Sequence, residues 1–338
     1  MMKMFDLDQE LKGVKRIAVA GHIRPDGDCV GSCLGLGLYL RENYPALEAV
    51  DLYLESVPER FRVLEGTETI RTSYPKETYD VFFSLDCGDI GRLGNAAEYL
   101  HTAGKVICVD HHISNHGFGD VQFIEPEASS ASELVYLLLD DKKLSVNAAK
   151  ALYMGIAHDT GVFQYSCTSS RTMEIAGKLI DKGFDFNELL DQTFFQKTYL
   201  QNQILGRALL ESMLLMDGKC IISALRKKDL DFYGVTGEDL EGIVSQLRNT
   251  AGVEVAIFLY ETAIQEFKVS LRSNGKVDVS RVASYFGGGG HVRAAGCTMQ
   301  GSVYDVLNNL TLHIEKQLKA AENGDREQIC DSRSNQYL

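Results

Sequence analysis

Residues 17–28 read IAVAGHIRPDGD, and this stretch decides the fold class. Its first five residues are small or apolar, which is typical of a short buried strand. A turn with one histidine and two carboxylates follows at once, and residues 28–43 then place small and apolar side chains at helical spacing. A strand, a polar turn and a helix in this order predict the first unit of an α/β fold.

The same alternation continues along the first half of the chain. Because its strand-like runs are apolar throughout, the sequence predicts a parallel sheet covered by helices on both faces. Further strands are predicted at 49–54, 81–86 and 105–110, with a helix at 94–103. Mostly helical sequence follows, with predicted helices at 131–139, 147–158, 171–182 and from 187 onward.

The pattern changes after a predicted linker helix at 198–213. Strands are predicted at 220–225, 253–260 and 267–271, and helices at 240–248, 279–285 and 303–321. These elements indicate a second, smaller α/β domain with a mixed sheet. The expected organisation is a first domain at 1–195, a linker helix at 196–214, a second domain at 215–322 and a disordered tail at 323–338.

Composition supports this organisation and restricts the partners. A chain of 338 residues is long enough for two domains, and 45% hydrophobic with 24% charged residues is typical of a soluble globular protein. The net charge of −13 makes the protein a poor binder of long duplex nucleic acid, because such binding depends on Lys and Arg at the phosphates. A short phosphorylated ligand at one focused site remains compatible with this charge.

The cysteines and the start of the chain indicate a cytoplasmic protein. The 8 cysteines are scattered and mostly lie in apolar stretches, as buried free thiols do in a reducing compartment. Cys29 and Cys33 have no second cysteine pair to complete a zinc site, and helical packing explains their spacing. The charged first residues do not resemble a signal peptide, and no run has the roughly 18 apolar residues of a membrane span.

Carboxylates and imidazoles gather where the predicted strands end. In open parallel sheets, ligands bind outside the carboxyl ends of the strands, so we expect these side chains to meet at one edge. One further acid ends the predicted helix at 147–158. The residues concerned are His22, Asp26, Asp28, Asp86, Asp110, His111, His112 and Asp159.

A metal centre is the physical interpretation of this cluster. Several carboxylates in one cleft raise one another's pKa unless a cation compensates them. About four Asp and two His suit Mn²⁺ or a related divalent ion, and this number of ligands suggests two ions, roughly 3.5–4 Å apart, that share a carboxylate.

Each acid also has a structural alternative. Asp26 and Asp28 could cap a helix, and Asp86 and Asp110 could be turn residues at strand ends. These alternatives do not explain why five of the 8 histidines lie in the same segments, beside Asp or Gly. We expect His158 among them to be structural; the five are His22, His111, His112, His158 and His291.

These segments resemble a known family. HIRPDGD at 22–28, DCGD at 86–89, DHH at 110–112 and DTG at 159–161 are similar, in this order, to the four motifs of the DHH phosphoesterases. GGGGH at 287–291, followed by AAG at 294–296, resembles the signature of the DHHA1 domain. The combination and the length resemble most the nanoRNase type, which acts on short oligoribonucleotides and on 3′-phosphoadenosine-5′-phosphate (PAP).

The resemblance implies a role for each residue of the cluster. One Mn²⁺ would be held by His22, Asp26 and Asp86, and the other by Asp28, Asp86, His111 and Asp159, with Asp86 bridging. His112 would lie near the scissile phosphate as a phosphate contact or proton donor. Asp110 would orient a histidine.

The glycine run has a physical interpretation of its own. Without Cβ atoms, such a run lets the backbone approach a ligand and direct successive N–H groups at an anion, although a flexible turn is the usual meaning of such segments. His291 and Arg293 follow the run, and both can hold a phosphate. The resemblance implies that the second domain binds substrate through Arg272, Gly288, Gly289, Gly290, His291 and Arg293.

The expected activity is two-metal hydrolysis of a phosphoester in short oligoribonucleotides, linear dinucleotides or PAP. A cyclic di-AMP phosphodiesterase and a RecJ-like single-strand exonuclease are the alternatives within the same superfamily. A non-catalytic nucleotide sensor is the alternative from another class, although no expected ligand is missing here. A dinucleotide-dependent oxidoreductase is disfavoured, because no G-x-G-x-x-G follows the first strand. The sequence leaves the oligomeric state open, with a homodimer as one option.

Overall fold

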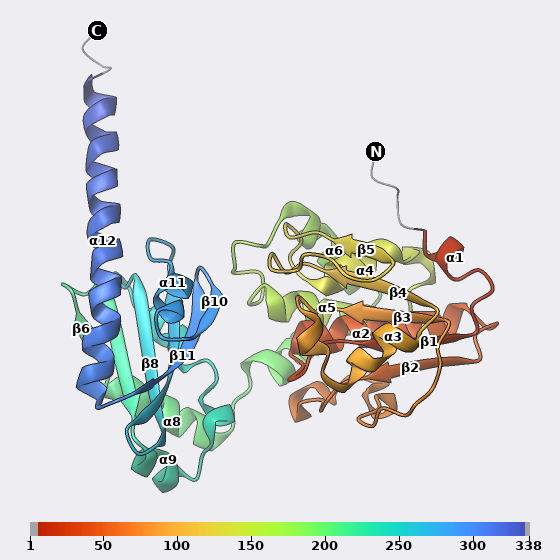
Figure 1. Cartoon of the computed structure of the whole chain (residues 1–338), viewed down its shortest axis with the longest axis horizontal. Helices are drawn as coiled ribbons and strands as arrows, with labels where there is room; N and C mark the ends of the chain where they lie inside the picture. The colour runs from red at the N-terminus through yellow and green to blue at the C-terminus, as the bar shows by residue number, and fades with distance from the viewer. Residues whose placement is uncertain (1–5, 335–338) are drawn as a thin grey trace. The chain divides into compact units, whose positions relative to one another are not determined.

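The protein, described by a computed structural model, consists of two compact units, Met1–Gln196 and Lys197–Leu338 (Figure 1). The structure describes residues 6–334, and the side chains of residues 6–321. Each unit is built around its own sheet, as the sequence predicts. Among the described residues, no helix combines the length and the apolar character needed to cross a membrane.

The first unit contains a five-stranded sheet in the order β2-β1-β3-β4-β5, with every neighbouring pair parallel. The central strands are buried on both faces, which explains why their sequences are apolar without alternation. Strand β5 is shorter and half-exposed, and its sequence pattern did not predict a strand. The strands are β1 (Arg16–Ala20), β2 (Ala49–Tyr53), β3 (Val81–Leu85), β4 (Lys105–Asp110) and β5 (Val121–Ile124).

Helices α2, α4 and α5 pack with β1 and β3 in the main apolar core, and a second cluster around Tyr53, Phe82 and Tyr99 covers the opposite face. Helices α2 and α5 lie unusually close, since a Cβ atom at Gly31 would be 2.5 Å from the carbonyl oxygen of Ala151. The helices are α1 (Leu7–Glu10), α2 (Gly27–Asn43), α3 (Tyr99–Thr102), α4 (Ala131–Leu138), α5 (Val146–Asp159), α6 (Ser170–Ile180) and α7 (Phe186–Leu190).

The predicted helix at 94–103 is only partly correct. A 3-10 segment at Ile90–Glu98 is interrupted at Gly94, whose φ is +55°, and α-helical geometry is confined to the single turn of α3. Glycine adopts this conformation without steric cost, so the chain bends where the sequence pattern suggested continuity. The remaining short helical segments are Glu59–Phe61, Thr67–Thr69, Asp141–Lys143, Asp191–Phe195 and Gly237–Leu240.

The second unit has a six-stranded mixed sheet in the order β10-β11-β9-β8-β7-β6, in which only β7 and β8 pair in parallel. Helices α11 and α12 cover one face, and α8, α9 and α10 cover part of the other. Its strands are β6 (Met213–Leu215), β7 (Cys220–Leu225), β8 (Val255–Ala263), β9 (Glu266–Ser273), β10 (Gly289–His291) and β11 (Ala294–Gln300). Its helices are α8 (Tyr199–Leu210), α9 (Lys227–Tyr233), α10 (Ile243–Arg248), α11 (Val279–Ser284) and α12 (Val303–Ser334).

Three of these strands were not predicted, and the end of the chain also differs from expectation. Strands β6, β10 and β11 are short, exposed or rich in Gly and Ala, so they carry little strand signal. Helix α12 continues to Ser334, over most of the stretch for which the sequence predicts a disordered tail. That stretch lacks proline and contains several good helix formers, so its local propensity permits this extension. Residues 335–338 lie outside the described residues.

Candidate metal centre and nucleotide-binding face

The predicted cluster forms at the carboxyl ends of three adjacent strands. Strands β1, β3 and β4 are neighbours in the sheet, so the residues that follow them reach the same edge. Helices α2 and α5 bring the remaining acids, Asp28 from the first turn of α2 and Asp159 from the last residue of α5. All eight predicted residues of this cluster therefore come together.

Asp86 lies in the middle of the cluster and is 2% exposed. Its Oδ2 is 3.5 Å from His22 Nε2, while its Oδ1 is 3.6 Å from both His111 Nε2 and His112 Nδ1. The backbone of Asp86 has a φ of +52°, a left-handed conformation that Asp tolerates better than most residues. One carboxylate thus faces three imidazoles.

His22 is oriented by the backbone. Its Nδ1 donates a hydrogen bond to the carbonyl oxygen of Ile23 at 2.8 Å, so Nε2 is the nitrogen that faces the acids. Asp26 Oδ2 lies 3.6 Å from that nitrogen, while Asp26 Oδ1 accepts the backbone N–H groups of Asp28 and Cys29. The capping alternative is therefore correct for one oxygen of Asp26, and its other oxygen remains directed at His22.

Asp28 is fixed by a second helix. Its two oxygens accept the backbone N–H groups of Ala131 and Ser132, at 2.6 and 2.9 Å, at the N-terminus of α4. His111 Nε2 lies 3.9 Å from Asp28 Oδ2 and 3.3 Å from Asp159 Oδ2. The side chains of Asp28, His111 and Asp159 thus form the second half of the cluster.

Electrostatics shows that this cluster attracts positive charge. Burial and the neighbouring Asp86 raise the pKa of Asp28 to about 7, and burial also raises the pKa of Asp159. Burial alone would lower the pKa of His111, but the carboxylates of Asp86 and Asp159 outweigh it and raise that pKa to about 10. Converging carboxylates of this kind are compensated by divalent cations in metal centres.

The donor atoms fit metal ions. In each of three groups of three residues, one donor atom from each residue lies within 4.8 Å of the others. Asp86 and His111 each belong to two groups, so neighbouring sites would share ligands. Carboxylate oxygen with imidazole nitrogen suits divalent ions such as Mn²⁺. The groups are His22–Cys29–Asp86, Asp86–His111–His112 and Asp28–His111–Asp159.

Cys29 is the one member of these groups that was not expected at the centre from the sequence. It follows Asp28 directly, is 0% exposed, and forms one of the three donor groups with His22 and Asp86. Its spacing to Cys33 on α2 suggested packing only, and its thiol does donate to the carbonyl oxygen of His22 at 3.8 Å. The only sequence signal was its position next to the acidic turn.

Asp110 and His112 form a pair beside the centre. His112 Nδ1 donates to Asp110 Oδ1 at 2.8 Å, and Asn115 Nδ2 donates to Asp110 Oδ2 at 2.7 Å. The expectation that Asp110 orients a histidine thus corresponds to His112 in the structure. His158 instead packs with Phe61 and Phe194, with ring centroids 5.0 and 5.2 Å away.

In the second unit, Arg272 and His291 lie on one face of the sheet. Ala294 of β11 pairs with Arg272 of β9 on one side and with His291 of β10 on the other. Directly paired residues of antiparallel strands project from the same face, so the two basic side chains flank a small alanine. Arg293 is exposed in the turn between β10 and β11, and its guanidinium lies near Gly275.

The glycine run behaves differently from the expectation. The N–H groups of Gly287 and Gly288 donate to the carbonyl oxygens of Ser284 and Ala283, so these two amides do not face an anion. A Cβ at Gly288 would lie 2.2 Å from the carbonyl oxygen of Gly296, whereas one at Gly289 would meet nothing within 4 Å. The run therefore lets β10 pack closely on β11 and leaves open space above Gly289.

Comparison with known proteins agrees with this geometry. Residues 16–156 match the DHH family N-terminal domain, and residues 217–320 match the DHHA1 domain. The bifunctional oligoribonuclease and PAP phosphatase NrnA of Bacillus subtilis is 30% identical over 284 residues, which are 82% of this chain and 87% of that protein. The chain belongs to the DHH family. It is therefore a phosphoesterase, a hydrolase of a family that works with divalent metal ions.

Two further relatives cover most of this DHH phosphoesterase. The protein of the same description from Thermus thermophilus is 30% identical over 310 residues, 88% of this chain and 89% of the relative. A crystal structure of an exopolyphosphatase-related protein from Bacteroides fragilis superposes with a TM-score of 0.85 at 25% identity. It covers 93% of this chain and 96% of that one, so the predicted DHH and DHHA1 architecture is confirmed.

Proposed function

We propose that this DHH phosphoesterase hydrolyses short oligoribonucleotides and PAP, using two divalent cations, with Mn²⁺ as the first candidate. The observation that carries the proposal is Asp86, whose two oxygens face His22 on one side and His111 on the other. A carboxylate in this position can bridge two ions. The substrate class is supported by the description of the relatives from Bacillus subtilis and Thermus thermophilus as bifunctional oligoribonucleases and PAP phosphatases.

The proposed ligands follow the two halves of the cluster. One cation would be held by His22, Asp26 and Asp86, and the other by Asp28, Asp86, His111 and Asp159. When bound, such a pair of ions would offset the charge of the phosphate oxygens and supply an activated water molecule for attack on phosphorus.

The remaining side chains bind the substrate or transfer protons. His112, held by Asp110, donates a proton to the leaving oxygen or contacts the scissile phosphate. Arg272 and His291 bind a phosphate of the substrate on the open face of the second sheet, with Gly289 and Gly290 beside them and Arg293 at the turn. In this division of labour, residues 1–195 cut and residues 215–322 bind substrate.

The charge of the protein supports short substrates. A net charge of −13 repels a long polyanion, whereas a few phosphates can be held by a local group of basic residues. Long single strands and duplexes are therefore expected to be poor substrates.

A substrate panel tests the proposal. The protein is incubated with Mn²⁺ and with 5′-phosphorylated di- to pentaribonucleotides, PAP, cyclic di-AMP or pyrophosphate, and the products are separated by chromatography. We expect release of mononucleotides from the oligoribonucleotides and of phosphate from PAP. Turnover of cyclic di-AMP or pyrophosphate alone would contradict the proposed substrate class, and no turnover at all would favour a sensor.

A further inference from the structure

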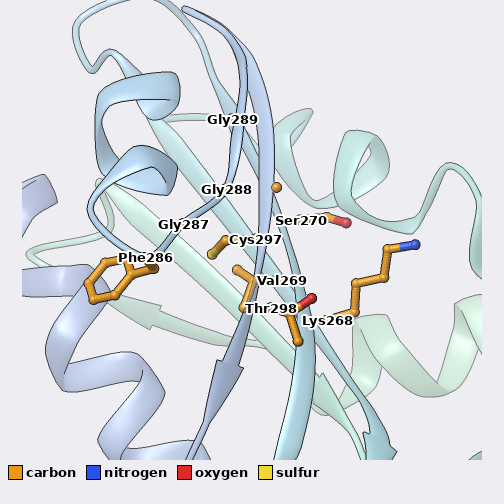
Figure 2. A pocket seen from close by; sticks show the side chains of 10 residues that line it. Lys268, Val269, Ser270, Phe286, Gly287, Gly288, Gly289, Cys297 and Thr298 are labelled. Carbon is orange, nitrogen blue, oxygen red and sulfur yellow. The ribbon is translucent and has the colours of Figure 1, made fainter. Parts of the chain in front are cut away.

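A pocket of about 450 Å³ lies in the second unit beside the glycine run. Its polar side chains are Lys268 and Ser270 of β9 and Thr298 of β11, and Gly296 contributes bare backbone between them. Figure 2 shows these three polar side chains on one side of β11 and Phe286 on the other. The pocket thus offers one ammonium group and two hydroxyl groups beside the bare backbone of Gly296, while Val269, Phe286 and Cys297 complete its lining.

Strand alternation places the three polar side chains of this pocket on the face that carries Arg272. In β9, Lys268, Ser270 and Arg272 alternate with buried apolar residues, so the three side chains project from the same face. In β11, Thr298 pairs directly with Lys268, and Gly296 pairs with Ser270. On this open face Lys268, Ser270 and Arg272 therefore form a row, with Arg272 at one end and Lys268 at the other.

The middle of this row has no large side chains. The register aligns Gly289, Gly296 and Ser270 across three strands, and only the last has a side chain. A ligand backbone can therefore lie close to the sheet between the two basic residues. The Nζ atom of Lys268 lies 5.9 Å from the centroid of the Tyr260 ring, a contact that restrains the exposed ammonium group.

The row ends at an acid. Glu266 is the next residue of β9 on this face, and its carboxylate accepts hydrogen bonds from Thr262 and Gln300. A phosphate beyond Lys268 would meet this negative charge, which opposes a longer polyanion. The face therefore favours phosphate as far as Lys268 and disfavours it beyond.

We propose that Lys268, Ser270 and Thr298 form a subsite for a second phosphodiester group of an oligoribonucleotide, adjacent to the phosphate that Arg272 and His291 bind. This inference rests on the proposed function and adds a length preference to it. Arg272 lies four residues after Lys268 in β9, about 13 Å away at roughly 3.3 Å per residue. A stacked strand rises about 3.4 Å per nucleotide, so the row is long enough for more than one nucleotide.

The variant Lys268→Gln tests the subsite with two substrates. For a 5′-phosphorylated triribonucleotide we expect KM to rise about tenfold, because one charge-assisted phosphate contact is lost, with kcat nearly unchanged. For PAP, a single nucleotide, both constants should stay the same. The dependence of log KM on log salt for the triribonucleotide should also flatten by about 0.7, the value for one phosphate contact of a single strand.

Two further variants separate this role from general effects. Lys316→Gln removes the same charge from an exposed position on α12, which packs on the opposite face, and should change neither substrate's KM nor the salt slope. Thr298→Val keeps the shape and should raise KM for the triribonucleotide only.

The outcomes keep the two proposals distinguishable. If wild-type protein hydrolyses both substrates but Lys268→Gln alters neither KM nor salt slope, the subsite is wrong and the proposed function stands. If wild-type protein hydrolyses neither, the proposed function itself is overturned.

Discussion

His112 Nδ1 donates to Asp110 Oδ1 at 2.8 Å, and Asp110 is fully buried at the end of β4. The carboxylate fixes the hydrogen on Nδ1, which leaves Nε2 as the nitrogen that can exchange a proton with substrate. Asp110 therefore acts as a positioning residue for His112. This assignment separates the pair from the acids that face the proposed cations.

The substitution Asp110→Asn tests this relationship. The amide can satisfy Asn115 or His112 in the native orientation, but it no longer holds an imidazole with a negative charge. We expect kcat to fall by about 10–100-fold with KM nearly unchanged, measured on PAP with Mn²⁺. Asp120→Asn makes the same charge change beside the start of β4, where Asp120 accepts the backbone N–H of Val106, and it should keep kcat. A drop in metal stoichiometry in Asp110→Asn would instead make Asp110 part of the metal centre.

Asp86 gives a second prediction, because its charge and its backbone can be tested separately. Asp86→Asn should abolish the bridge and lower kcat by at least about 100-fold, while titration calorimetry with Mn²⁺ shows fewer bound ions. Its stability in the absence of metal should be lower than that of wild type: burial alone would raise the pKa of Asp86, but the imidazoles of His111 and His22 outweigh it and lower that pKa, so the charged form stabilises the fold.

The matched variant Asp86→Ala adds a backbone cost. The φ of +52° suits Asn but disfavours Ala by about 1–2 kcal/mol, so thermal unfolding should occur at a lower temperature than for Asp86→Asn. Wild-type turnover in either variant would contradict the two-metal assignment.

Adjacent glycines of the run give opposite predictions. Gly288→Ala forces a Cβ against the carbonyl oxygen of Gly296 and should lower the free energy of unfolding by about 1–3 kcal/mol. Gly289→Ala adds a methyl group in open space, so its unfolding should match wild type while KM rises about tenfold. Denaturant unfolding and steady-state kinetics of both variants measure this contrast. Normal KM in Gly289→Ala would show that substrate does not approach this position.

The metal centre could be predicted from sequence because its signals are local. A polar residue directly after a buried strand must lie at the sheet edge, and three adjacent strands repeat this pattern at His22, Asp86 and His111. What the pattern could not give was the partner of each acid. That Asp28 binds the amides of α4 depends on a contact 103 residues away along the chain.

The missed features have weak or misleading local patterns. Strand β10 is formed by Gly289–His291, where glycine suggests a loop, and only pairing with β11 makes it a strand. For the same reason the N–H groups of Gly287 and Gly288 were expected to face an anion. In the structure, nearby carbonyl oxygens already accept hydrogen bonds from both N–H groups. The row from Lys268 to Arg272, with Thr298 and Gly296 beside it, likewise can be recognised only when the register of β9 and β11 is known.

Glu133 gives the last prediction, on stability rather than catalysis. Its buried carboxylate accepts hydrogen bonds from Ser129 at 2.5 Å and from Thr172 and Arg171 at 2.7 Å each, which ties α4 to α6. Burial alone would raise the pKa of Glu133, but these hydrogen bonds outweigh it and lower that pKa. The folded protein therefore binds this proton less readily than the unfolded chain, and stability falls as the carboxylate is protonated.

Glu133→Gln should lower the free energy of unfolding by about 1–3 kcal/mol at neutral pH. The contribution is complete above the unfolded pKa of about 4.3 and disappears as the pH falls through the lower folded pKa, so the two proteins should converge in acid. Urea unfolding followed by circular dichroism across this range measures the difference. For the exposed control Glu127→Gln, the free energy of unfolding should follow that of wild type at every pH. If the difference between Glu133→Gln and wild type does not change with pH, the three hydrogen bonds do not depend on the carboxylate charge.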